Sequence, residues 1–179
     1  VPNFFINPFS TGLKPLFNKK ITNIISYINN TDPQGKWLVL GDHLMANYLK
    51  ASGINVFNGV KYLPDLPAMQ LLDPELKYKH IYNRYAHIEC QVSQNITNKT
   101  DDISFNLLTP DHYQIFIHPD SEKLKEIGIT YILFTYNPYL TNVKNFHPLI
   151  NIPDSNMWIY ESTNSKHRIT PTVRTWGTR

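Results

Sequence analysis

The 179-residue sequence has one cysteine, no long apolar run and no block of like charges. Because Cys90 stands alone, no intrachain disulfide can form, and metal or redox motifs built on several cysteines are excluded. The longest apolar run, Ile129 to Phe134, is far shorter than the roughly 20 residues of a membrane-spanning helix. We therefore expect this stretch of chain to be water-soluble.

Other signatures are missing as well. The 17 basic and 14 acidic residues are scattered, so no concentrated basic surface is expected, and we expect no nucleic-acid partner. Gly41 stands alone where a phosphate-binding loop would need several glycines, and Ser104 and Ser121 lack the glycines of a nucleophile elbow. We expect no cofactor. The chain begins Val1-Pro2 without a signal-peptide pattern, which indicates a processed chain or an excised segment.

The apolar content is sufficient for one core. Hydrophobic residues make up 41% of the chain, and its length lies within the roughly 100–200 residues typical of one domain. We expect a single domain over residues 1–161. The tail over residues 162–179 is basic and poor in apolar residues, so we expect it to be poorly ordered.

Apolar spacing and turn residues predict alternating helices and strands. A helix is expected over residues 14–29, a buried strand over 37–40, and a helix that begins at Asp42 and ends before Gly53. Extended chain resumes at 54–57. Further strands are expected over 85–92, 103–108, 113–117, 129–135 and 157–161, with a helical turn near 68–72, a helix over 119–127 and a loop-rich region over 136–156.

This order predicts the fold class. Two β-α-β units, over 37–57 and 113–135, favour parallel strand pairing, whereas the expected hairpin over 103–117 adds antiparallel strands. We therefore expect an α/β fold: a single compact domain with a mixed, partly parallel sheet flanked by helices.

Functional groups are densest between Asp73 and Glu89. Within this stretch, Arg84 lies between Tyr82 and Tyr85, and a guanidinium beside aromatic rings can bind a phosphate or carboxylate or stack on a sugar. The alternative is a structural arginine that bridges a carboxylate or a loop carbonyl.

Two further candidates, His87 and Glu89, alternate onto the polar side of the expected strand. Imidazole and carboxylate together can bind a metal or act as an acid and base pair, and a third metal ligand could come from His80 or His112. Two such residues on a strand are also ordinary surface residues, so we expect no metal site. Cys90 falls on the apolar side and is expected to be an inert buried thiol.

Asp42 and His43 follow a buried strand. Open α/β sheets bind ligands at the carboxyl ends of their strands, where a helix N-terminus also attracts anions. Asp42 is therefore a candidate ligand-binding residue, and the alternative is that it only caps the helix.

A family resemblance is carried by four stretches. Leu124 to Phe134, followed by Trp158 to Glu161, resembles the end of extracytoplasmic domains in bacterial polytopic membrane proteins of GT-C-like architecture, which are related to lipid-linked glycosyltransferases. Asp73-Pro74 and Tyr82 to His87 resemble another segment of the same uncharacterised group. The resemblance covers residues 36–161.

The resemblance implies an accessory domain on the extracytoplasmic face of the bacterial cytoplasmic membrane. Its implied partners are the transmembrane portion of the same polypeptide and a glycan or lipid-linked sugar. GT-C enzymes carry their catalytic acids on loops beside the first membrane helices, so the resemblance implies no catalysis by this piece alone. Two alternatives stay open: a stand-alone secreted or periplasmic carbohydrate- or protein-binding module, and a soluble hydrolase that uses His87 and Glu89.

Overall fold

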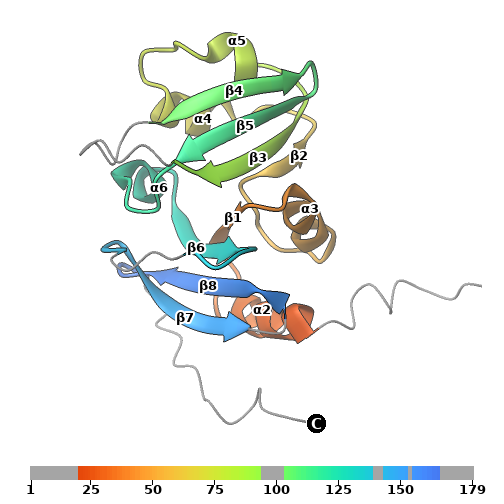
Figure 1. The fold of residues 1–179 in the computed structure, drawn as a ribbon, viewed down its shortest axis with the longest axis vertical. Coiled ribbons are helices and arrows are strands. Elements are labelled where there is room, and N and C mark those ends of the chain that lie inside the picture. The colour runs from red at the N-terminus through yellow and green to blue at the C-terminus, as the bar shows by residue number, and fades with distance from the viewer. Residues whose placement is uncertain (1–19, 94–102, 139–142, 153–154, 166–179) are drawn as a thin grey trace, which may run out of the picture.

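The computed structural model describes residues 20–93, 103–138, 143–152 and 155–165. Within these ranges eight strands form one mixed sheet, in the order β4-β5-β3-β1-β6-β8-β7 with β2 paired to β3 (Figure 1). The expected α/β fold, one compact domain with a partly parallel sheet and flanking helices, is confirmed. The elements are α2 (Lys20–Thr31), β1 (Lys36–Leu40), α3 (His43–Ala51), β2 (Gly59–Lys61), α4 (Leu66–Leu72), α5 (Lys79–Tyr82), β3 (Ala86–Val92), β4 (Ser104–Thr109), β5 (His112–Ile117), α6 (Glu122–Glu126), β6 (Ile129–Phe134), β7 (Phe146–Ile152) and β8 (Met157–Ser162).

Parallel strands occupy the middle of the sheet. β1 runs parallel to both β3 and β6, and β3 runs parallel to β5. The antiparallel strands β4, β8 and β7 lie towards the two edges, and β4 and β5 form the expected hairpin. The β-α-β unit over 113–135 is present, although β3 and β1 lie between its two strands.

The sheet has a hydrophobic core on each face. Ile24 of α2 and Leu49 of α3 pack against Val39 on one face. On the other face, α4, α5 and α6 cover apolar side chains that include Ile88 and Ile132. From Trp37 to Leu40, residues of β1 alternate between the two cores, and for this reason these four positions are all apolar. The domain therefore has three layers.

A buried asparagine completes the pairing of β1. The segment before Asn58 pairs with the start of β1 through a parallel bridge from Val56 to Trp37. Asn58 is 1% exposed, and its side-chain amide accepts from the Val39 N–H at 3.1 Å and donates to the Val39 carbonyl at 2.8 Å. β3 pairs with β1 only at the next residue, Leu40. Segment 54–57, which was expected to be extended, thus pairs with β1 through a single bridge, and the Asn58 side chain continues this pairing along β1.

β7 was not predicted. Its buried residues Phe146, Leu149 and Ile152 recur every three positions, because the register shifts between Pro148 and Ile150. A bulge of this kind removes the period of two by which a strand is recognised. As an edge strand, β7 also tolerates Pro148, which cannot donate a ladder hydrogen bond.

The remaining boundaries shift modestly. The first helix, expected over 14–29, is α2 (Lys20–Thr31), and residues 14–19 lie outside the described ranges. β8 extends to Ser162, and of the expected tail only residues up to 165 are described. Among the described helices, none combines the length and the apolar character needed to cross a bilayer.

Replacing Asn58 by alanine would leave a donor and an acceptor of Val39 buried without partners. We expect N58A to lower the free energy of unfolding by about 2–6 kcal/mol, because each of the two buried unsatisfied groups costs roughly 1–3 kcal/mol. Urea denaturation measures this change. The exposed Asn151→Ala is the control, with an expected change within about 0.5 kcal/mol. Equal stability of the two variants would contradict the pairing role.

Candidate functional site

A tight turn joins β1 to α3 at the carboxyl end of the central strand. Gly41 has a φ of 105°, and a Cβ there would lie 2.3 Å from Oγ1 of Thr135, so only glycine fits. Asp42 then caps α3, its carboxylate accepting from the Leu44 N–H at 2.8 Å. This contact agrees with the alternative interpretation, in which Asp42 caps the helix. His43 begins the helix beside the polar side chains of β3 and β5.

Strand register brings these side chains together. In the parallel pair β3/β5, His87 lies opposite His112 and Glu89 lies opposite Gln114. The rings of His43 and His87 are 4.7 Å apart, and those of His87 and His112 are 5.2 Å apart. We call this group the histidine–glutamate site; its members are His43, His87, Glu89, Gln91, His112 and Gln114.

Glu89 is the centre of the histidine–glutamate site. Its Oε1 accepts hydrogen bonds from the side-chain amides of Gln91 at 2.5 Å and Gln114 at 3.0 Å. Its Oε2 lies 3.2 Å from Nε2 of His112 and 4.0 Å from Nδ1 of His43. The His112 contact is close, but Nε2 makes no aligned hydrogen bond. One oxygen is therefore held by two amides, and the other faces two imidazoles.

The surroundings keep Glu89 ionised. Burial by itself, the largest single effect, raises the pKa of a carboxyl group, but the two amide hydrogen bonds and the neighbouring His112 and His43 outweigh it. The net effect lowers the pKa of Glu89. A carboxylate that stays charged at neutral pH accepts hydrogen bonds well and is a poor general acid.

His87 is held as a neutral acceptor. Asn47 accepts from the Val60 N–H through its Oδ1 at 2.8 Å, which orients its Nδ2 towards Nε2 of His87 at 3.0 Å. Nε2 must then be unprotonated. Burial lowers the pKa of His87, and so do the neighbouring His43 and His112; a backbone hydrogen bond to His43 acts in the other direction.

The three imidazoles and Glu89 do not converge on one point as metal ligands would. In the described ranges, no three His, Cys, Asp or Glu side chains converge as metal ligands would. His80, the other conceivable third ligand, is on α5, exposed. His112 is the residue that the fold brings to Glu89, through the β3/β5 register.

Arg84 and Tyr82 lie apart from the histidine–glutamate site. The Arg84 guanidinium donates to the carbonyl of Pro110 at 3.1 Å and to the carbonyl of His80 through a short contact. These bonds match the structural alternative, in which the arginine ties loop carbonyls together. Tyr82 is 1% exposed and packs on Phe105, so its ring is part of the core and is not accessible to a ligand.

Tyr85 forms an exposed aromatic pair. It is 49% exposed, and its ring lies 5.7 Å from that of Tyr62, which is 81% exposed. Both tyrosines adjoin the last registered pair of β2 and β3, Lys61 with Ala86. Tyr85 precedes Glu89 by four residues, about 13 Å of extended chain.

Sequence reasoning identified part of the histidine–glutamate site. His87 and Glu89 followed from strand alternation, whereas Gln91 and Gln114 were missed. Gln91 shares the alternation of His87 and Glu89, which is a signal that could have found it. Gln114 depends on the register of β5 against β3, for which a single sequence carries no signal.

The fold and the site define a three-layer α/β domain with a polar site beside the carboxyl end of a central parallel strand, the position at which open α/β sheets bind ligands. The chain belongs to the family described as a domain of unknown function, DUF7654, which matches residues 15–166. Neither a curated protein nor a solved structure matches the chain.

The lowered pKa of His87 links this site to stability. Below the ordinary histidine pKa of about 6.5, the unfolded chain takes up a proton more readily than folded His87 does. His87 therefore makes the free energy of unfolding rise with pH, up to about pH 6.5, and lowers it as pH falls. We expect H87Q, which retains an acceptor for Asn47, to flatten this rise.

Urea denaturation at intervals from pH 5 to 8 measures the slope for each protein. His80→Gln, at an exposed position, is the control and should leave the slope as in the wild type. A slope in H87Q as steep as that of the wild type would show that His87 is not held neutral by its neighbours.

Proposed function

We propose that this chain is a sugar-binding accessory domain of a larger, membrane-embedded glycosyltransferase-like protein, on the extracytoplasmic face of the bacterial cytoplasmic membrane. The observation that supports sugar binding is the Glu89 carboxylate, held by Gln91 and Gln114 and flanked by imidazoles. The membrane partner and the location rest on the sequence resemblance over residues 36–161.

The chemistry of the histidine–glutamate site suits hydroxyl groups. An ionised carboxylate accepts strong hydrogen bonds, and neighbouring imidazole and amide groups can donate to or accept from the same hydroxyls. Because Glu89 is negative and His87 is neutral, a phosphate or carboxylate ligand would be repelled. A neutral, hydroxyl-rich ligand is favoured over an anion.

The exposed tyrosine pair supports a sugar in particular. Tyrosine rings present an apolar face and a polar hydroxyl, the combination that packs against the CH face of a sugar ring. About 13 Å of strand from Tyr85 to Glu89 is longer than one hexose. An oligosaccharide, free or lipid-linked, would contact both.

A binding role without catalysis fits the same groups. Glu89 is ionised, so it is poorly suited to donate a proton to a leaving group. Cys90 lies on the opposite, apolar face of β3, and burial raises the pKa of its thiol far above neutral pH. Catalysis would then belong to the remainder of the parent protein.

Sugar binding can be tested by isothermal titration calorimetry of the domain with a panel of neutral oligosaccharides. We expect E89Q to weaken binding roughly 10- to 100-fold, because a hydrogen bond to a charged group contributes about 1.5–3 kcal/mol. Glu126→Gln, on the exposed side of α6, is the matched control and should bind as the wild type does. The absence of binding by any oligosaccharide, or equal binding by E89Q, would contradict the proposal.

The membrane partner can be tested separately, by an immunoblot of fractionated bacteria with an antibody against this domain. We expect a band several times heavier than 20.8 kDa in the membrane fraction, because the domain is proposed to be part of a polytopic protein. A soluble band near 20 kDa would favour the stand-alone binding module instead.

A further inference from the structure

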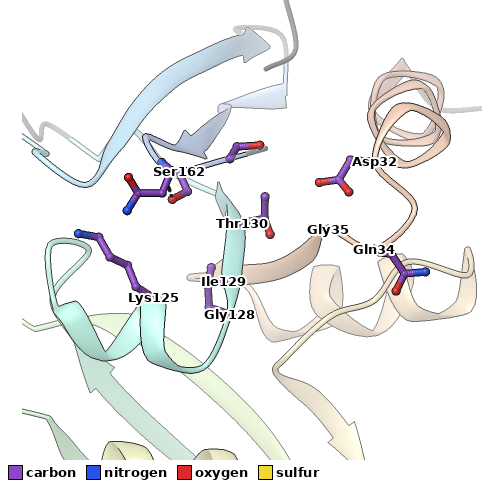
Figure 2. A pocket seen from close by; sticks show the side chains of 10 residues that line it. Asp32, Gln34, Gly35, Lys125, Gly128, Ile129, Thr130 and Ser162 are labelled. Atoms are coloured by element: carbon purple, nitrogen blue, oxygen red, sulfur yellow. Dashed lines mark hydrogen bonds between the residues drawn. The ribbon is translucent and has the colours of Figure 1, made fainter. Parts of the chain in front are cut away.

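A second polar region lies at the other end of the sheet. Two adjoining cavities, of about 650 and 330 Å3, share Ser162 and Ser165 where β1 and β6 begin and β8 ends. Figure 2 shows the larger one, with Asp32, just after α2, on one side and Lys125 of α6 on the other. The β8 side of this region is three strand spacings, roughly 14 Å, from β3 and the histidine–glutamate site.

The smaller cavity is lined by a fully buried carboxyl group. Glu161 of β8 is 0% exposed, and neither of its carboxyl oxygens has a hydrogen-bond partner among the described residues. His147 lies opposite Glu161 on β7, with its Nε2 3.4 Å from Oε2 of Glu161. A buried carboxyl group without hydrogen bonds destabilises a fold whether it is charged or neutral, so its presence requires another explanation.

A second buried carboxylate is close to the same place. Tyr131 lies opposite Glu161 in the β6/β8 register and donates from its hydroxyl to Asp32, which is 6% exposed. Burial, Asp32 and Glu161 all raise the pKa of Tyr131. Within the described ranges, neither Asp32 nor Glu161 forms an ion pair with lysine or arginine.

Little positive charge in the cavities offsets these groups. Lys125 lines the larger cavity, but its Nζ lies 3.0 Å from a carboxylate oxygen of Glu122. The side chain of His147 is 38% exposed, so it reaches the outside of the smaller cavity. The region thus places two buried carboxyl groups and several hydroxyl groups, all able to accept hydrogen bonds, beside the two cavities.

We propose that Glu161 and His147 form a binding site for a cationic nitrogen group, an ammonium or a guanidinium. Such a group would donate N–H bonds to both oxygens of Glu161, and its charge would be compensated by Glu161 and Asp32. The hydroxyls of Ser162 and Thr163 would accept further N–H bonds. A metal ion is disfavoured, because no third His, Cys, Asp or Glu among the described residues joins this pair as a ligand.

The test is isothermal titration calorimetry of the full chain with agmatine, n-butylamine and tetramethylammonium. Agmatine and n-butylamine carry N–H donors and should bind, whereas tetramethylammonium has the charge without a donor and should not. We expect E161Q, which is nearly isosteric, to weaken binding of agmatine and n-butylamine at least tenfold. Glu75→Gln, an exposed position between α4 and α5, is the control and should bind as the wild type does.

Thermal unfolding distinguishes a binding role from a structural one. If Glu161 serves binding, E161Q removes a buried carboxyl group that has no hydrogen bond among the described residues, and the Tm of E161Q should equal or exceed that of the wild type. If Glu161 serves the fold, its Tm should fall. Equal amine binding in E161Q, a lower Tm without loss of binding, no amine binding at all, or binding of Zn²⁺ or Mg²⁺ alone would each overturn the proposal.

Two sources of the cationic group can be separated in the same experiment. Lysine and arginine with both backbone ends blocked represent basic side chains of a polypeptide, whereas agmatine represents a free small amine. Binding of the blocked residues would identify a protein or peptide ligand, and binding of agmatine alone would identify a small molecule. E89Q should bind all of these compounds as the wild type does, so failure here and failure of sugar binding are distinguishable.

Discussion

The hydrogen bonds between Asn58 and Val39 hold the centre of this domain together. β1 is the middle strand of the sheet, and one of its sides has two successive neighbours, the chain around Val56 and then β3. The Asn58 amide occupies the position between them, so no backbone group of Val39 is left unpaired. The change of neighbour brings Cys90 of β3 opposite Leu40, where the Gly41 turn and α3 begin, and so brings the polar residues of β3 beside His43.

Two polar regions at different ends of the sheet differ in how their carboxyl groups are satisfied. One carboxylate oxygen of Glu89 accepts from two side-chain amides, and the other lies beside an imidazole. This arrangement keeps the carboxylate charged and leaves a polar surface for a neutral ligand. Glu161 differs, because it is fully buried and its carboxyl oxygens have no hydrogen-bond partner among the described residues. The first carboxylate is satisfied without a ligand, whereas the proposed cationic ligand would supply the hydrogen bonds that the second lacks among the described residues.

Much of the fold was predictable from local patterns. The apolar run of β1 and the capped helix after Asp42 follow from residue spacing, since each burial face is encoded within a few neighbouring residues. The alternation of helices and strands also indicated a partly parallel sheet, although not which strands pair. β7 was missed because a register shift near Pro148 hides its alternation. β2 was missed because its three residues are too few to show an alternating pattern. The α5 turn that carries Tyr82 into the core was missed for a related reason, since four residues are too few for a helical period.

The sequence by itself determined the fold class and the polar side of β3 with His87 and Glu89, because helix and strand periodicities are local properties of the chain. Only the tertiary structure decided that His112 and Gln114 contact Glu89, that Arg84 binds loop carbonyls, and that Glu161 lines a cavity. These facts depend on strand order and register. Both are set by packing between segments distant in the chain, for which one sequence carries no local signal.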